Sequence, residues 1–159
     1  MQRANDIQVG GNHYKKSKYE HWDWAVNCGL DYLASAASKY VFRWRDKNGM
    51  QDLEKARHYV MKLIEVSPLV LTRHLHTRPP KPYIIHETTK FIRENHIELD
   101  AEITIYDLLA IWETREHLEE VIAQIDTLIE HLKYHRVMEQ GKAAKPVPLE
   151  DSNKHAERA

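Results

Sequence analysis

Glycine is scarce in this sequence. The 159 residues contain five, or about 3% against a usual ~7%. Tight turns rely on glycine, so the scarcity disfavours a sandwich or barrel of many strands. The only cysteine, Cys28, excludes a disulfide framework within the chain and a cysteine-rich zinc site.

An excess of one charge and a long apolar run are also lacking. The formal net charge is −1, which argues against binding large nucleic acids through bulk positive charge but leaves a local basic stripe open. No run approaches the ~18 apolar residues of a membrane span, and residues 1–6 lack the apolar start of a signal peptide. We therefore expect no membrane contact and a cytosolic location.

The first half of the sequence shows helical periodicity. Residues 1–20 are expected to form an arm, followed by a short helix around 22–26 that Gly29 closes. The spacing of apolar residues then predicts a helix over 31–47, which Asp31 caps. A turn at Asn48-Gly49 leads into a helix that begins at Gln51 and that Pro68 kinks or ends. Two helices joined by a short turn form an antiparallel hairpin.

The second half follows a stretch in which Pro79, Pro80 and Pro82 favour an extended spacer. We expect a helix over 84–95. Residues 103–105 suit a brief strand, whereas residues 108–112 look helical. A helical hairpin dominated by residues 108–132 follows. Apolar residues seven apart predict one long helix there: Ile111, Leu118, Ile125 and Leu132. From residue 140 onward apolar residues are few, which is typical of a disordered tail.

The fold class is therefore all-α, with an N-terminal helical hairpin behind a glycine-containing arm and a C-terminal hairpin with one long helix. We divide the chain into a helical domain at 1–77, a proline-rich linker at 78–83, a C-terminal helical region at 84–138 and a disordered tail at 139–159. The apolar stripe of the long helix predicts partial burial against another subunit, and hence a homo-oligomer formed through the C-terminal helix.

Three cations, Lys39, Arg43 and Lys47, are four residues apart and share one stripe of the first strong helix. Like charges at this spacing repel by a few tenths of a kcal/mol per pair, so carboxylates or a bound phosphate must offset them. On the next helix Asp52, Lys55 and Tyr59 also share one side. Asp52 is expected to pair with Arg43 or Lys47; a Mg²⁺ role is the alternative.

The N-terminal arm contains a second unusual stretch, residues 9–14. Gly10-Gly11 permits backbone conformations that present N–H groups to an anion. His13 is suited to binding a phosphate and Tyr14 to stacking on a base. The sequence has no phosphate-binding loop of the common kinases. Although it has eleven histidines, their spacing supports no specific metal site.

These stretches carry a family likeness. Residues 9–14, Trp22, Lys39-Tyr40-x-x-Arg43, Lys47 and the run from Asp52 to Tyr59 resemble a family of small bacteriophage proteins. The family is catalogued as a domain of unknown function and is often labelled nucleotide kinase, after an enzyme that phosphorylates deoxynucleoside monophosphates without a phosphate-binding loop. The resemblance covers about residues 7–66. The half after the proline-rich stretch resembles no family.

The resemblance implies a small nucleotide ligand, kinase-like phosphoryl transfer with ATP and Mg²⁺, and a location in the cytoplasm of a bacterial host. The residues it points to are His13, Tyr14, Lys39, Arg43, Lys47, Asp52, Lys55 and Tyr59. No catalytic residue is assigned. Ser35-Ala36 stands where the family has Gly-Asn, which puts ligand choice and catalysis in question.

Two other functions remain open at this point. The same residues would serve a non-catalytic protein that sequesters a nucleotide, for example a host-defence signal. The long helix and the unmatched second half would instead suit a protein that acts on a host factor.

Overall fold

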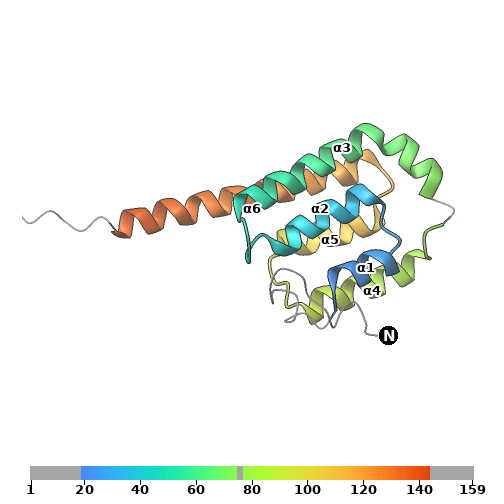
Figure 1. Cartoon of the computed structure of the whole chain (residues 1–159), viewed down its shortest axis with the longest axis horizontal. Coiled ribbons are helices and arrows are strands. Elements are labelled where there is room, and N and C mark those ends of the chain that lie inside the picture. The colour runs from blue at the N-terminus through green and yellow to red at the C-terminus, as the bar shows by residue number, and fades with distance from the viewer. Residues whose placement is uncertain (1–18, 75–76, 144–159) are drawn as a thin grey trace, which may run out of the picture.

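The computed structural model describes residues 19–74 and 77–143, which contain helices and no strands (Figure 1). This confirms the all-α fold. The helices are α1 His21–Asn27, α2 Tyr32–Arg43, α3 Met50–His74, α4 Lys81–Glu94, α5 Asp100–Ile111 and α6 Arg115–Ala143. The arm at 1–18, with its glycine pair, and residues 144–159 lie outside the described residues.

The α2–α3 hairpin forms as predicted, with one shortened helix. Asp31 caps α2, because its carboxylate accepts hydrogen bonds from the backbone N–H groups of Leu33 and Ala34, both at 2.9 Å. Gly49 turns the chain with a φ of 52°. However, α2 ends at Arg43, and residues 44–49 form turns before α3 begins. The prediction of a helix up to residue 47 was therefore wrong.

Helix α3 continues through Pro68 to His74. Proline lacks a backbone N–H donor, and its ring crowds the preceding turn. A proline inside a continuous helix therefore bends that helix. Figure 1 shows the last part of α3 running in a different direction from its first part. The alternative in which Pro68 ends the helix was wrong.

The proline-rich stretch is held against the rest of the chain. Arg78 donates hydrogen bonds to the carbonyl oxygens of Ala110 (2.8 Å) and Trp112 (2.9 Å), which satisfies the end of α5. Pro79 lies against Gly29, which has a φ of 63°. Helix α4 already begins at Lys81, so the extended spacer is shorter than predicted.

Helices α5 and α6 differ from the expected boundaries. Residues 103–105 belong to α5, so the strand alternative was wrong. The long helix is present, but it begins at Arg115 and reaches Ala143, so residues 139–143 are helical and not part of a disordered tail. Among the helices that the structure describes, none is long and apolar enough to cross a membrane.

The core is one hydrophobic cluster to which both halves of the chain contribute. Helices α2, α3, α6 and α5 pack in that order around it, α5 closes on α2, and α1 and α4 cover one end. The heptad residues Leu118 and Ile125 are buried within this one chain, where α3 and α5 supply the partner helices. The domain boundaries proposed above stay a prediction, as does the homo-oligomer.

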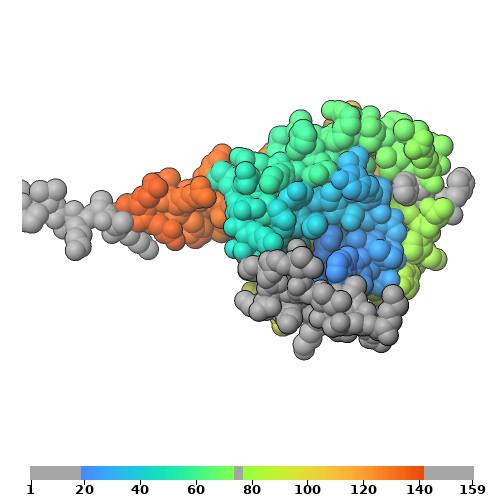
Figure 2. Space-filling view, in the orientation of Figure 1, coloured from blue at the N-terminus to red at the C-terminus, as the bar shows by residue number. Residues whose placement is uncertain are grey.

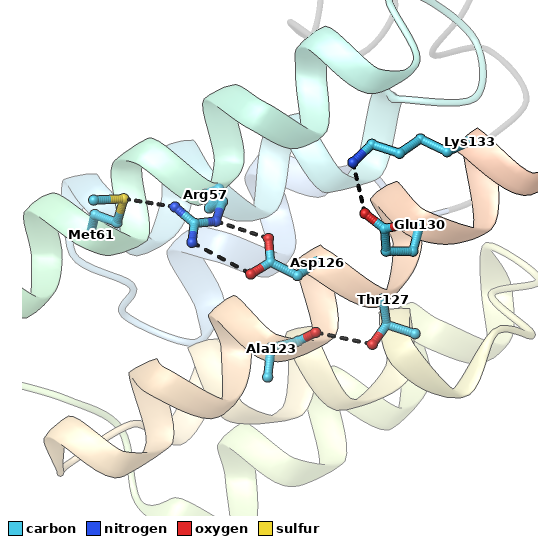
Figure 3. Close-up of polar contacts among 7 residues, drawn as sticks. All are labelled: Arg57, Met61, Ala123, Asp126, Thr127, Glu130 and Lys133. Carbon is cyan, nitrogen blue, oxygen red and sulfur yellow. Dashed lines mark hydrogen bonds and ion pairs between the residues drawn. The ribbon is translucent and has the colours of Figure 1, made fainter.

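Helix α3 is also tied to α6 by an ion pair on the surface of the bundle. Figure 3 shows the guanidinium of Arg57 facing Asp126, with Nε 2.9 Å from Oδ1. Both side chains are more than one third exposed, so the pair adds little stability but fixes which faces of the two helices meet.

Candidate functional site

Several predicted site residues meet on the α2–α3 hairpin. Because α3 returns antiparallel to α2, the side of α3 that carries Asp52, Lys55 and Tyr59 faces the last turn of α2. Each of the three contacts either Arg43 or Tyr40 of α2. The structure therefore groups four of the eight residues that the sequence indicated.

Arg43 and Asp52 form the shortest contact of this group. The Arg43 guanidinium donates from Nε to Oδ2 (2.9 Å) and from Nη2 to Oδ1 (3.0 Å), the two-pronged geometry that suits a carboxylate. Asn48 adds a third donor at 3.2 Å. The carboxylate is fully buried and the arginine side chain is 20% exposed. This confirms the expected structural ion pair.

The surroundings of Asp52 also set its charge state. Burial of the carboxyl would raise its pKa, but the hydrogen bonds from Arg43 and Asn48 outweigh burial, so the pKa of Asp52 lies below its usual value. Both carboxylate oxygens are occupied by donors. Asp52 is thus a charged anchor of the hairpin and does not offer oxygens to a metal ion.

Tyr40 is the centre of the exposed part of the site. The Arg43 guanidinium lies over its ring at 4.6 Å from the centroid, and Lys55 Nζ lies 5.5 Å from the same centroid. Tyr59 stacks on Tyr40 with centroids 5.6 Å apart and planes at 20°. Tyr32, 74% exposed, meets Tyr59 edge to face. The contact with Tyr32 raises the pKa of Tyr59.

A shallow hollow opens beside this aromatic pair. Its volume is about 390 Å³, and its lining consists of one turn of α2 and two turns of α3: Tyr40, Gln51, Glu54, Lys55, His58 and Tyr59. The hollow offers two aromatic rings, a lysine ammonium, an imidazole and one carboxylate. These groups match a ligand that has a planar ring and a phosphate. We call this surface the Tyr40–Tyr59 hollow.

The other predicted residues lie elsewhere. Lys39 is exposed on α2 on the side nearer His21, whose pKa its charge helps to lower. Lys47 lies beyond the end of α2, in the turn, where its backbone N–H donates to the Arg43 carbonyl at 3.1 Å. The three cations therefore do not form one stripe of one helix. His13 and Tyr14 lie outside the described residues.

Sequence reasoning missed Tyr40 as the centre of the site, together with Tyr32, His58 and Gln51. Tyr40 precedes Arg43 by three residues, a spacing that puts both side chains on one helix face. That signal is present in the sequence, but Tyr40 also fits the spacing of the apolar residues of α2, which favours a place in the core.

A second hollow, of about 450 Å³, lies between the end of α2 and the loop joining α4 to α5. Carboxylates dominate its charge, since Asp46, Glu94, Glu98 and Glu102 line it with Arg45 and His96. Glu102 is buried and accepts hydrogen bonds from Trp44 Nε1 at 2.6 Å and Arg45 Nη2 at 2.7 Å. This hollow repels a phosphate, and Glu102 ties the α2 end to α5.

A histidine–serine pair lies in the core and not on a surface. His21 Nε2 is 2.8 Å from Ser38 Oγ, and both residues are buried. The ring of His21 contacts Trp24, Phe42 and Phe91. Burial, helped by the charge of Lys39, lowers the pKa of His21 to about 3. His21 is therefore neutral and packs as a core residue.

In the part of the chain that the structure describes, no three histidine, cysteine or acidic side chains come together as ligands for a metal ion. Comparison of the chain with protein-family models, with curated proteins and with solved structures found no match.

Proposed function

We propose that this protein binds a small phosphorylated nucleotide at the Tyr40–Tyr59 hollow. The observation that carries the proposal is the pair of stacked tyrosines with the Lys55 ammonium over one ring, at the mouth of a hollow of about 390 Å³. A base stacks on the exposed ring surface of Tyr59 or Tyr32, while Lys55 and His58 attract the phosphate. The aromatic rings thus bind the base, and the two basic side chains bind the phosphate.

This assignment changes the role of Arg43. The sequence pattern left Arg43 and Lys39 open to a bound phosphate, yet two guanidinium nitrogens of Arg43 already donate to Asp52. We therefore propose that Arg43 holds Tyr40 and the hairpin in place. Lys55 becomes the cation in contact with the ligand.

The reaction that the family resemblance implies is transfer of a phosphoryl group to a deoxynucleoside monophosphate, with ATP as donor. Mg²⁺ would neutralise charge between the transferred and leaving phosphates. Magnesium in such sites is often held by one or two carboxylates together with phosphates and water. Glu54 is the carboxylate that lines the hollow and fits this role, whereas the oxygens of Asp52 are occupied.

Binding is tested by isothermal calorimetry of the full chain with deoxynucleoside monophosphates and nucleoside triphosphates. Lys55→Met keeps the aliphatic stem and removes the charge, and we expect affinity to fall about tenfold or more, equal to about 1.4 kcal/mol. Lys62→Met is the matched control, because Lys62 lies on the same helix but pairs with Glu65 on an exposed surface. Absence of binding to every nucleotide, or equal affinity in Lys55→Met, would overturn the proposal.

Turnover is tested on the same samples by chromatography after incubation with ATP and Mg²⁺. Appearance of a nucleoside diphosphate that is lost in Glu54→Gln supports kinase-like transfer. Tight binding with the ligand recovered intact instead supports the second candidate, a protein that sequesters a nucleotide.

By the same resemblance we propose that the chain is a bacteriophage protein that acts in the cytoplasm of a bacterial host. A host protein is the alternative partner, and it would be supported if nucleotides do not bind while residues 84–143 are required for the biological effect.

A further inference from the structure

The C-terminal part of α6 stands clear of the helical body. Figures 1 and 2 show it as a single rod that leaves the body, with none of the other described helices beside it. From residue 131 to residue 141 every residue except Leu132 is exposed. The exposed residues include three large apolar side chains: Tyr134 (61%), Val137 (65%) and Met138 (45%). A solvated helix of this length lacks the packing that normally stabilises helices in proteins.

These apolar side chains do not continue the face of α6 that packs on its own body. Nine residues, or two and a half turns, separate the buried Ile125 from Tyr134, so the two point to opposite sides of the helix. Eleven residues, or about three turns, separate Ala123 from Tyr134 and also Thr127 from Met138. These four residues therefore share one side of α6, which we call the outer face.

The outer face carries two small residues, Ala123 and Thr127, followed by two large ones, Tyr134 and Met138, an arrangement that is self-complementary. Ala123 and Thr127 are exposed over the body, and Figure 3 shows the Thr127 hydroxyl donating to the Ala123 carbonyl, at 3.0 Å. That bond satisfies the hydroxyl within the helix and leaves a surface of small side chains. Tyr134 and Met138, three turns further on, supply the bulk that such a surface accommodates.

We propose that the outer face of α6 binds the same face of a second copy of this chain, with the two helices antiparallel. An axis between Glu130 and His131 sets Tyr134 of each copy opposite Thr127 of the other, and Met138 opposite Ala123. This is the isologous contact of a two-fold dimer. The proposal is independent of the nucleotide site, which lies on the α2–α3 hairpin.

Charge selects the antiparallel orientation. Residues 122–130 contain two carboxylates, Asp126 and Glu130, and no basic side chain. Residues 131–139 contain two histidines, His131 and His135, while Lys133 already pairs with Glu130 and Arg136 lies on the opposite side of the helix from Thr127. Antiparallel pairing about the stated axis sets Glu130 of each copy opposite His131 of the other, and Asp126 opposite His135, whereas a parallel pair in register would set each carboxylate opposite the same carboxylate of the other copy.

The oligomeric state is tested by light scattering and sedimentation of the full chain over a wide range of concentration. We expect the wild type to reach the mass of two chains, and Ala123→Glu and Met138→Glu to remain at the mass of one. Gln140→Glu is the control, since it adds the same charge about 200° around the helix from Met138. Circular dichroism checks that each variant stays helical. A wild type that is monomeric at all concentrations, or dimers that survive both outer-face variants, overturn the proposal.

Orientation is tested by oxidation of the double variant Thr127→Cys/Tyr134→Cys. The native Cys28 is buried, so it does not compete for the oxidant. The antiparallel pair predicts a covalent dimer for the double variant and none for Tyr134→Cys alone. A covalent dimer formed by Tyr134→Cys alone would mean parallel pairing and would overturn the proposed geometry.

Discussion

Arg43 donates two parallel hydrogen bonds, of 2.9 and 3.0 Å, to the fully buried carboxylate of Asp52. The two residues are unequal partners, because the arginine keeps one fifth of its side-chain surface in contact with solvent. The same guanidinium lies over the ring of Tyr40. One pair thus fixes the α2–α3 hairpin and places the aromatic centre of the proposed nucleotide site.

This difference in exposure predicts that removing the Arg43 guanidinium destabilises the fold more than removing the charge of Asp52. Arg43→Met leaves the buried carboxylate without a counter-charge and with Asn48 as its remaining donor, and we expect a loss of about 3 kcal/mol in the free energy of unfolding. Asp52→Asn leaves a guanidinium that water reaches, and we expect a loss of about 1–2 kcal/mol. Urea unfolding of both variants and of the double variant checks the order. Equal losses would show that Asp52 is hydrated.

The same pair predicts a pH dependence. The pKa of Asp52 in the folded protein lies below its usual value. Ionised Asp52 therefore stabilises the fold at pH values above the usual carboxyl pKa, and this stabilisation is lost as the pH falls through the pKa of the folded state. In Arg43→Met the pKa of this carboxyl rises, because burial is then opposed only by Asn48. The stability gap between wild type and Arg43→Met should therefore narrow on acidification. A gap that stays constant from neutral pH to pH 3 would contradict the assignment.

A separate pH effect comes from His21. Its folded pKa is about 3 against 6.5 in the unfolded chain, so only the unfolded chain takes up a proton between these values. The free energy of unfolding should therefore fall as pH drops below 6.5, by at most about 1.4 kcal/mol per pH unit from this group. His21→Gln should lose stability less steeply in urea unfolding at pH 7, 6 and 5. Parallel slopes for the two proteins would contradict a neutral, buried imidazole.

Local signals in the sequence predict the helices well and the contacts between distant helices poorly. Asp31 and Gly49 act within a few residues, through a cap and a turn, so their roles can be read from the chain itself. The partner of the α6 stripe could not be predicted, because a heptad pattern says that Ile125 needs a neighbouring helix but not which chain supplies it. In the site, the pairing of Arg43 with Asp52 follows from the hairpin. The position of Tyr40 between two cations depends on the exact register of α2 against α3.

Gly29 and Gly49 offer a matched test of how the proline-rich stretch is held. Both have a positive φ, 63° and 52°, so alanine at either position carries a backbone strain of roughly 1–2 kcal/mol. At Gly29 an added Cβ would also lie 2.9 Å from Pro79 Cδ, while at Gly49 nothing lies within 4 Å. Thermal unfolding should therefore show a clearly larger loss for Gly29→Ala. Similar losses would mean that residues 78–80 do not pack on the α1–α2 turn.

The two carboxylate oxygens of Asp31 have different partners, and their contributions to stability can be separated with suitable variants. Oδ1 caps α2 by accepting from the Leu33 and Ala34 amides, and Oδ2 accepts a hydrogen bond from Trp112 Nε1 at 3.1 Å. Asparagine is as good a cap as aspartate, but its amide would present a donor to the indole N–H. Asp31→Asn should therefore lose only the Trp112 contact, and Asp31→Ala should lose about 1 kcal/mol more, the usual value of a cap.

Trp112→Phe supplies the control for this separation, because it removes the indole N–H that Oδ2 accepts. In that background Asp31→Asn should cost much less than in the wild type, while Asp31→Ala should still show the loss of the cap. Free energies of unfolding from urea titrations of the six proteins complete the cycle. If Asp31→Asn cost the same in both backgrounds, the connection between the α2 cap and the end of α5 would not contribute to stability, and Arg78 alone would hold that junction.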